Sequence, residues 1–327
     1  MFGYLSVAQL STMIRAKLCD VPRDVDLIVG IPRSGMIPAY LLGLYLNRLV
    51  VDIETFLANG PGPGHGARHV STLVAQPLAA RHILLVDDSL ASGASMSTCL
   101  ARIAASPYAG KITSCAIVVE PSMAPRVDLS FAQMPQPRIF EWNAFHHPYL
   151  ELSCFDLDGL LCTDPTPREN DDGPRYRTFL SNTRPLFKPA RRIGHIVSAR
   201  LEKYRGETEE WLTANGINYG SLHLIDLPSR AERMRTGAHC RHKAQVYRES
   251  ASVLFYESDP AQAPEIARLS GKPVLCTANM EMHMPTGFQV RAHIKSAKWH
   301  LRRPLGRVKG HLREKMRVLV HGSSLSR

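Results

Sequence analysis

Two pairs of aspartates in this 327-residue sequence follow apolar runs, where their carboxylates can act on sugar phosphates. Asp87 and Asp88 end the run Ile83-Leu-Leu-Val and precede small residues, Ala91 to Ser95. Small residues let backbone N–H groups approach a phosphate at a helix N-terminus. The neighbouring carboxylates can accept hydrogen bonds from sugar hydroxyls. The first pair therefore predicts a site for a sugar phosphate.

The second pair, Asp156 and Asp158, lies in Cys154-Phe-Asp-Leu-Asp-Gly-Leu-Leu-Cys162. One carboxylate at such a strand end can attack phosphorus as a nucleophile. The other can protonate the leaving oxygen and later activate water. A Mg²⁺ beside them would neutralise the phosphate charge. This pair therefore predicts hydrolysis of a phosphate monoester.

The first pair, with its flanking residues, closely resembles the PRPP-binding motif of type I phosphoribosyltransferases, over roughly residues 1–150. The resemblance implies PRPP as the donor substrate and a requirement for Mg²⁺. Ser92 and Ser95 replace the usual threonines of the phosphate loop and keep their hydroxyls. The resemblance assigns PRPP binding to Asp87, Asp88, Ser92, Gly93 and Ser95, and to the pyrophosphate loop Arg33, Ser34 and Gly35.

A loop rich in glycine and proline, residues 59–66, lies where that family has its flexible catalytic loop. Its composition predicts a mobile segment. It offers His65, Arg68 and His69 but no lysine that aligns with the family's, so the catalytic residue there stays open.

The second pair resembles the first motif of the haloacid dehalogenase (HAD) superfamily, and further motifs follow in family order over residues 151–277. The resemblance implies Asp156 as nucleophile and Asp158 as general acid and base. It implies that Ser198, in Ile196-Val-Ser-Ala-Arg200, and Lys243 bind phosphate. The implied Mg²⁺ ligands are Asp156, Asp158 and Asp259, with Glu257 as the alternative to Asp259. The gap of about 40 residues between the first two motifs predicts a small cap or none.

Strand-like and helix-like runs alternate along the chain and can position both sites. The alternation predicts an α/β fold of two doubly wound parallel-sheet domains, with binding at the carboxyl ends of strands. We expect a phosphoribosyltransferase-like domain at 1–150, a HAD-like domain at 151–285 and a basic tail at 286–327. Residues 121–149 are proline-rich and predict irregular structure. The predicted strands are 25–30, 49–53, 82–88, 111–119, 151–156, 194–198, 221–225, 253–257 and 273–276, and the predicted helices are 6–18, 38–46, 95–105, 207–215, 243–250 and 260–269.

The composition is that of a globular protein, with 44% hydrophobic and 21% charged residues. No apolar run is long enough to span a membrane, and the N-terminus lacks the pattern of a secretory signal. Seven cysteines without a C-x-x-C pair fit a reducing compartment. We therefore expect a cytoplasmic protein.

The net charge of +11 is concentrated in the tail, where Thr286 to Arg327 hold eleven Lys or Arg and one acid. Between Val290 and Leu319, apolar residues recur every three or four positions and predict an amphipathic helix. Such a basic helix is typical of binding to an anionic membrane surface. A helix packed on the body or on a partner is an alternative. Nucleic-acid binding is the third, although the aromatic interleaving of a single-strand binder is absent.

Together, the two resemblances predict transfer of 5-phosphoribose to an acceptor, followed by removal of its 5-phosphate. Unphosphorylated ribofuranose suits a lipid-linked glycan in polysaccharide biosynthesis, which the tail would reach at the inner face of the membrane. One rival is a nucleobase phosphoribosyltransferase with an attached nucleotidase. Another is a PRPP-sensing regulator that binds nucleic acid. The acceptor, the anomeric outcome and a homo-oligomeric state stay open. A nucleobase transferase needs a hood, a set of residues that binds the base. The chain offers four aromatic residues for it, namely Phe131, Phe140, Trp142 and Phe145.

Overall fold

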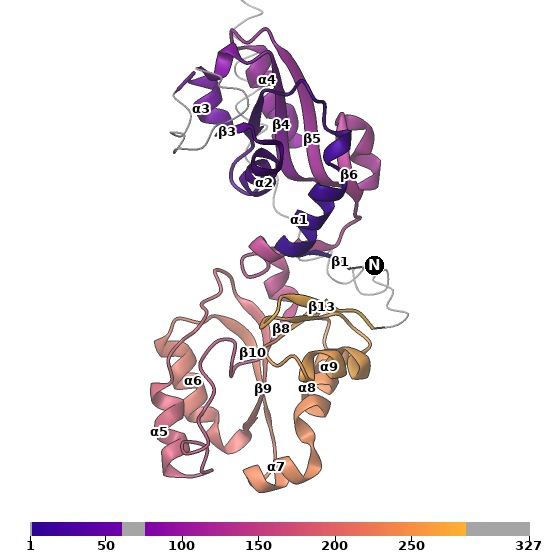
Figure 1. Ribbon diagram of the computed structural model, residues 1–327. Helices are drawn as coiled ribbons and strands as arrows, with labels where there is room; N and C mark the ends of the chain where they lie inside the picture. The colour runs from indigo at the N-terminus through magenta and orange to yellow at the C-terminus, as the bar shows by residue number, and fades with distance from the viewer. Residues whose placement is uncertain (1, 61–75, 286–327) are drawn as a thin grey trace, which may run out of the picture. The chain divides into compact units, whose positions relative to one another are not determined.

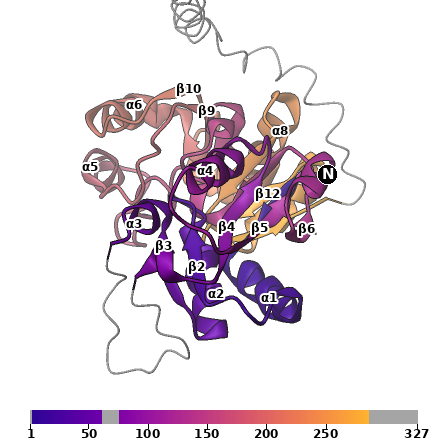
Figure 2. The same cartoon turned by 90° about the horizontal axis from the view of Figure 1, so that it is seen from above.

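The computed structural model describes residues 2–60 and 76–285, all within one compact unit of residues 1–288. They form two larger sheets and a two-stranded one (Figures 1 and 2). His65, Arg68, His69 and the tail from residue 286 lie outside the described residues. Within the described ranges, no helix is long and apolar enough to cross a membrane.

Five parallel strands form the first sheet. Helices cover both of its faces because alternate residues of a strand point to opposite sides. Ile28 and Leu84 pack with the first two helices, and Val29 and Leu85 pack with the next two. The strand order is β3 (Leu49–Asp52), β2 (Leu27–Gly30), β4 (His82–Leu90), β5 (Lys111–Val119) and β6 (Leu129–Gln133), and the helices are α1 (Val7–Ala16), α2 (Met36–Leu46), α3 (Ile53–Leu57) and α4 (Ala94–Ala104).

The second sheet has five parallel strands and one antiparallel edge strand. Cys154 and Phe255 of its central strands pack with Tyr247 and Ile266 of two helices on one face. Figures 1 and 2 show α5 and α6 on the other side of this sheet. The strand order is β10 (Tyr219–Ile225), β9 (Ile193–Leu201), β8 (Ser153–Phe155), β11 (Leu254–Glu257), β12 (Val274–Cys276) and β13 (Glu281–His283), and the helices are α5 (Pro174–Asn182), α6 (Arg205–Ala214), α7 (Arg230–Thr236), α8 (Ala238–Glu249) and α9 (Gln262–Ser270).

Short elements complete the described chain. Strand β1 (Gly3–Leu5) pairs in parallel with β7 (Arg138–Phe140), so the start of the chain is tied to the segment after the first sheet. Turns of 3₁₀ helix lie at Leu18–Asp20, Pro77–Ala79, Pro121–Arg126, Glu141–Asn143, Pro148–Leu152 and Glu202–Tyr204.

The mixed α/β fold with parallel sheets is confirmed, and several details of the prediction are wrong. Strand β4 continues two residues past Asp88 because it keeps pairing with β5 up to Leu90. The segment 121–149 is not irregular throughout, since it supplies β6 and β7. Strand β13 is antiparallel, so the second sheet is mixed. Helices α5 and α7 were not predicted: α5 buries only Tyr176, Phe179 and Leu180, and α7 buries only Arg233. The domain boundary near residue 150 stays a prediction.

Candidate active sites

The first acidic pair is buried within β4, close to the predicted pyrophosphate loop. Asp87 is 7% and Asp88 6% exposed. A Cβ at Gly35 would lie 2.9 Å from the Val86 carbonyl oxygen and 3.0 Å from the Asp87 Cα. Glycine therefore lets the 33–35 loop approach β4 this closely. The structure thus brings the acidic pair and this loop together, with Arg33 exposed and available to an anionic ligand.

The small-residue loop turns from β4 into α4. Gly93, at the start of the helix, has a φ of 76°, a left-handed conformation that glycine adopts without steric cost. Ser92 Oγ accepts a hydrogen bond of 3.4 Å from the Ala94 amide. Ser92 and Ser95 are both exposed at this helix start. Their hydroxyls and the first amides of α4 lie at one helix start, and their role as a phosphate cradle stays a prediction.

Trp142 contacts the acidic pair, a role that the sequence did not show. Its Nε1 donates a 2.8 Å hydrogen bond to Asp88 Oδ2, and its ring stacks on Phe140 at 4.9 Å. Of the other aromatic residues proposed for a hood, Phe131 and Phe140 are buried in the core. Phe145 packs against Phe187 and Tyr256. Trp142 is therefore the one member of that set that reaches the site.

The electrostatics of the pair predict pH-dependent ligand binding. Burial, and then the Asp88 carboxylate, raise the pKa of Asp87 to about 7. A neutral carboxyl accepts hydrogen bonds from sugar hydroxyls less strongly than a carboxylate does. PRPP affinity is therefore expected to fall as the pH drops below about 7, by up to about tenfold per unit. Titration calorimetry between pH 5.5 and 8.5 measures this fall, and a pH-independent affinity would contradict it.

The same raised pKa predicts the opposite trend for the stability of the ligand-free protein. A carboxyl whose pKa is higher in the folded state binds its proton more tightly there than in the unfolded chain. It therefore contributes stability at low pH that is lost as the pH rises toward 7. Asp87→Asn should flatten this loss in thermal unfolding between pH 4.5 and 7.5. An unchanged pH profile in the variant would show that Asp87 is not responsible.

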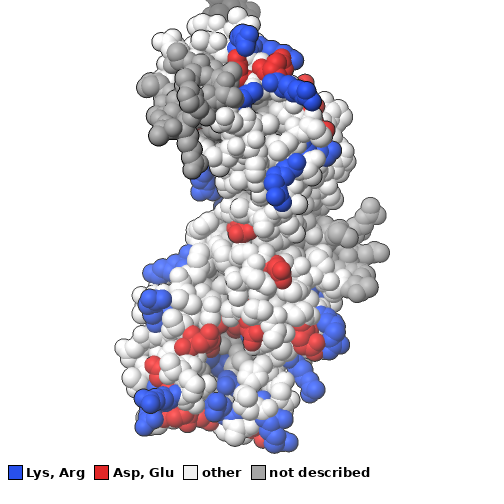
Figure 3. All heavy atoms as spheres, in the orientation of Figure 1, with Lys and Arg blue, Asp and Glu red and all other residues white. Residues whose placement is uncertain are grey.

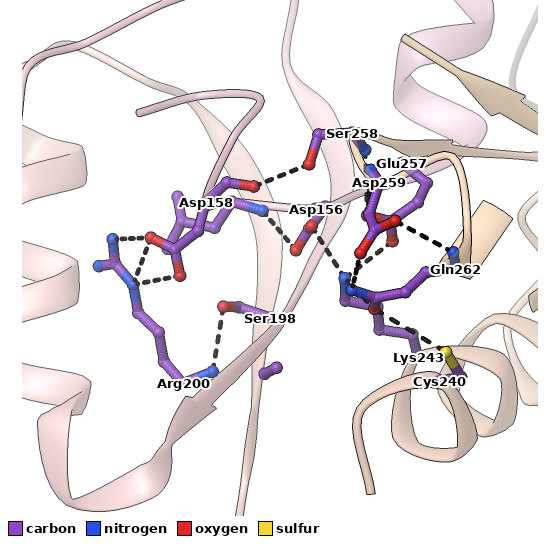
Figure 4. A network of polar contacts seen from close by, with 12 residues as sticks. Asp156, Asp158, Ser198, Arg200, Cys240, Lys243, Glu257, Ser258, Asp259 and Gln262 are labelled. Carbon is purple, nitrogen blue, oxygen red and sulfur yellow. Dashed lines mark hydrogen bonds and ion pairs between the residues drawn. The ribbon is translucent and has the colours of Figure 1, made fainter. Parts of the chain in front are cut away.

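The second site centres on a buried lysine between two carboxylates (Figure 4). Asp156 follows β8 and Glu257 ends β11, and these neighbouring parallel strands bring their carboxyl ends together. Lys243 Nζ donates 2.8 Å hydrogen bonds to Asp156 Oδ2 and to Glu257 Oε2. Lys243 lies in the middle of α8 and not at its start as predicted, because the helix begins at Ala238.

The charges around Asp156 act on its ionisation in opposite directions. Burial, and then the Glu257 carboxylate, raise the pKa of Asp156 well above its usual value, and Lys243 offsets only part of that rise. Burial lowers the pKa of Lys243, but Asp156 and Glu257 raise it overall, so its ammonium persists at neutral pH. The ammonium group stabilises the carboxylate form of Asp156, which is the form that can attack phosphorus.

Asp158 points away from Asp156 and pairs with Arg200 (Figure 4). Arg200 Nη2 donates to Asp158 Oδ1 at 2.6 Å, and Nε donates to Oδ2 at 3.1 Å. Arg200 is fully buried on β9 and also donates to Thr208 Oγ1. A charged residue within an otherwise apolar strand signals such a buried pair, and the sequence analysis gave Arg200 no role of its own. Proton transfer by Asp158 requires this pair to open.

Ser198 and Asp259, the other two predicted site residues, differ in burial and in their hydrogen-bond partners. Ser198 is fully buried, and its Oγ accepts a hydrogen bond from the Arg200 amide. The structure therefore does not expose this hydroxyl as a phosphate-binding residue requires. Asp259 lies before α9 and accepts hydrogen bonds from the Ala261 amide and from Gln262 Nε2. Burial raises the pKa of Asp259, but these hydrogen bonds, led by that of Gln262, lower it overall.

A cleft of about 520 Å³ opens at this end of the sheet. Its acids outnumber its cations, and in Figure 3 acidic side chains gather around a hollow in the part of the molecule that holds this sheet. Asp164, His239 and Arg233 also line the cleft and were not evident from the sequence. Arg233 lies on α7 and donates to the Ala199 carbonyl. Arg233 Nε is buried without a partner among the described residues. The acids that line the cleft are Asp156, Asp158, Asp164, Glu257 and Asp259.

The carboxylates that line the cleft are suitable ligands for a hard cation, but they are not arranged around a common point. Carboxylate oxygens are the ligands that Mg²⁺ prefers. Among the residues that the structure describes, no group of three or more His, Cys, Asp or Glu is arranged to hold a metal ion. The reason is local: Asp156 is drawn toward Lys243 and Asp158 toward Arg200. The Mg²⁺ ligands Asp156, Asp158 and Asp259 stay a prediction.

Residues 5–152 match the family model described as the phosphoribosyl transferase domain. This match supports a type I phosphoribosyltransferase domain over this part of the chain, and with it a PRPP-dependent transferase. No curated protein matches the chain in sequence.

Solved structures match less than half of the chain. The purine phosphoribosyltransferase from Pyrococcus horikoshii Ot3 is 20% identical, with a TM-score of 0.33, and covers 43% of this chain and 93% of its own. The xanthine-guanine-hypoxanthine phosphoribosyltransferase from Helicobacter pylori is 16% identical, with a TM-score of 0.33, and covers 44% and 93%. The family match, and not these structural matches, supports the domain.

Proposed function

We propose that the chain is a bifunctional enzyme that transfers 5-phosphoribose from PRPP to an acceptor and then removes the 5-phosphate. The observation that carries the second step is the buried Asp156–Lys243–Glu257 cluster at the floor of an acidic cleft. A nucleophilic carboxylate with a fixed counter-ion at a strand end, and a second carboxylate two residues on, resembles the HAD phosphatase motifs. The family match of residues 5–152 carries the first step.

In the transferase, the residues around β4 would hold the donor while its C1–pyrophosphate bond breaks. Asp87 and Asp88 would accept hydrogen bonds from the ribose hydroxyls. The start of α4 would cradle the 5-phosphate, and the 33–35 loop would hold the pyrophosphate. Mg²⁺ on the pyrophosphate would neutralise its charge as it departs. The attacking acceptor oxygen loses its proton in this step, and the residue that takes this proton stays open.

In the phosphatase, Asp156 would attack phosphorus and form an acyl phosphate while the ribosyl oxygen departs. Asp158, released from Arg200, would protonate that oxygen and then accept a proton from the water that hydrolyses the acyl phosphate. Lys243 holds Asp156 in place, and Arg233 lies on the cleft wall as a cation for the phosphate. Asp156, Asp158 and Asp259 would hold Mg²⁺, which would screen the charge of the phosphate.

The acceptor that fits this sequence of reactions best is a lipid-linked glycan in polysaccharide biosynthesis. A nucleotide is usually kept phosphorylated, so a phosphatase fused to a nucleobase transferase would undo its product. The burial of Phe131 and Phe140 in the core also leaves a smaller set of residues for a nucleobase hood. Incubation with PRPP and candidate acceptors, followed by mass spectrometry, tests the proposal. A product that keeps its phosphate would contradict the second step, and nucleosides alone would favour the nucleobase alternative.

The tail would bring the enzyme to the inner face of the membrane. Removing residues 286–327 takes away ten of the eleven net positive charges and none of the proposed catalytic residues. The truncated protein is expected to lose binding to vesicles that contain anionic lipid, because each basic residue near such a surface contributes about 1 kcal/mol. Co-sedimentation at low and high salt measures the loss.

The outcomes of the truncation separate the alternatives for the tail. Hydrolysis of a soluble phosphoribosylated substrate should continue in the truncated protein. A full-length protein that ignores vesicles and binds oligonucleotides would favour the regulator. Unfolding of the truncated protein would favour a helix packed on the body.

A further inference from the structure

A second cavity, of about 990 Å³, adjoins the proposed phosphatase cleft. It is lined by the loop that follows Thr163, by one face of α5 and by Arg184. Asp164 lines both this cavity and the catalytic cleft, so the two spaces are neighbours. The larger cavity therefore lies where the rest of a substrate could sit if its phosphate reached Asp156. No step of the proposed chemistry uses the residues of this cavity.

Three arginines line the cavity and supply its positive charge. Arg168, Arg175 and Arg184 are all exposed, and none forms an ion pair or a side-chain hydrogen bond with a described residue. Other exposed arginines are paired: Arg177, also on α5, with Glu207, and Arg235 on α7 with Glu232. Guanidinium groups without a protein partner are suited to bidentate recognition of carboxylate or phosphate.

The acidic residues in and near the cavity form no ion pair with these three arginines. The Glu169 carboxylate accepts hydrogen bonds from the Thr166 amide and hydroxyl, at 2.8 and 2.7 Å. Asp164 has a raised pKa, through burial and then the charge of Asp158, which places it in the electrostatic field of the cleft. Asp171 lies near Arg175, but its carboxylate accepts from the Gly173 and Tyr176 amides. The three arginines also outnumber the two acids that line the cavity, Asp164 and Glu169, so the cavity presents a net positive charge to a ligand.

We propose that this cavity binds an acidic saccharide, namely the part of the phosphatase substrate that carries the phosphoribosyl group. The inference rests on the proposed function and names its substrate class: the saccharide bears a carboxylate or a second phosphate. Thr166, Thr178 and Asn182 supply polar groups for sugar hydroxyls, and Phe179 supplies an apolar surface. A neutral nucleobase would leave the three guanidinium groups without an anion.

The experiment compares phosphate release from three soluble substrates, each with a 5-phosphoribosyl group. The group is linked to a neutral hexose, to a uronic acid or to a hexose phosphate. The full chain is expected to show kcat/KM values at least about tenfold higher for an acidic substrate than for the neutral one. The triple variant Arg168→Gln, Arg175→Gln, Arg184→Gln should bring this ratio close to one. The substrate that loses most identifies carboxylate or phosphate as the recognised group.

A matched variant and a binding measurement control the experiment. Arg248→Gln, at an exposed position on α8 outside the cavity, should keep the ratio of the full chain. Calorimetry with a uronic-acid disaccharide and with its neutral counterpart tests the cavity without catalysis. Equal kcat/KM values for acidic and neutral substrates, or a ratio that survives in the triple variant, would overturn the inference. If no substrate is hydrolysed, the proposed phosphatase fails. Arginine-dependent disaccharide binding would then still support the cavity, and its absence would overturn the cavity as well.

Discussion

Asp156→Asn is expected to abolish phosphate release and to leave phosphoribosyl transfer intact. The amide is a poor nucleophile, and loss of a covalent nucleophile lowers kcat by roughly three to six orders of magnitude. The variant should therefore accumulate a phosphoribosylated acceptor, heavier than the final product by one phosphate. Mass spectrometry of the products, with pyrophosphate release as the readout of transfer, measures both steps.

The substitution keeps the shape of a buried residue and removes one partner of the Lys243 ion pair. A thermal unfolding measurement must therefore accompany it, because an uncompensated buried charge destabilises. Asp226→Asn, at an exposed position without a hydrogen-bond partner among the described residues, is the matched control and should retain both activities. A folded Asp156→Asn protein that no longer releases pyrophosphate from PRPP would show that the two reactions do not occupy separate sites.

The double variant Asp87→Asn, Asp88→Asn is expected to lower PRPP turnover by about two to four orders of magnitude. Each hydrogen bond to a charged group contributes about 1.5–3 kcal/mol, and the variant weakens one such contact at each position. Hydrolysis of a phosphoribosylated substrate should continue, because the second site lies on another sheet. Pyrophosphate release and phosphate release, measured on the same sample, separate the two effects.

The melting temperature of the double variant tests whether misfolding could explain a loss of PRPP turnover. Two adjacent buried carboxylates repel each other, so neutral side chains at both positions should preserve or raise the melting temperature near pH 7. Asp20→Asn is the matched control, since its ion pair with Lys17 is exposed and contributes little. Undiminished PRPP turnover in a folded double variant would exclude this pair as the ribose site.

The strands and the clustering of acids at their ends could be predicted because both depend on local pattern. Apolar runs of four to nine residues mark buried parallel strands, and parallel strands present their carboxyl ends at one edge. The proximity of Asp156 and Glu257 follows from that rule once both strands are identified. Strand β5 lies at the predicted residues, Lys111–Val119, and the first helix lacks only the ends of its predicted range.

The partners of the site residues could not be predicted in the same way. Asp158 meets Arg200 and Asp88 meets Trp142 across 42 and 54 residues of sequence, and no local pattern encodes such distances. Ser198 lies in a predicted strand end, but β9 continues to Leu201 and encloses the hydroxyl. Side-chain direction depends on where neighbouring elements end, which is the least certain part of a sequence-based prediction.

The pairing of Asp158 with Arg200 bears on whether the proposed phosphatase would also hydrolyse PRPP, the donor. PRPP carries the same 5-phosphate as the phosphoribosylated product, so a phosphatase that attacked every such group would destroy the transferase's own substrate. In the structure, the buried guanidinium of Arg200 holds Asp158, the proposed proton donor, away from Asp156, the proposed nucleophile. If the proposed phosphatase step occurs, it therefore needs a ligand that opens this pair. A glycan held beside the cleft can meet that condition by its additional contacts, and free PRPP, which lacks the glycan, cannot.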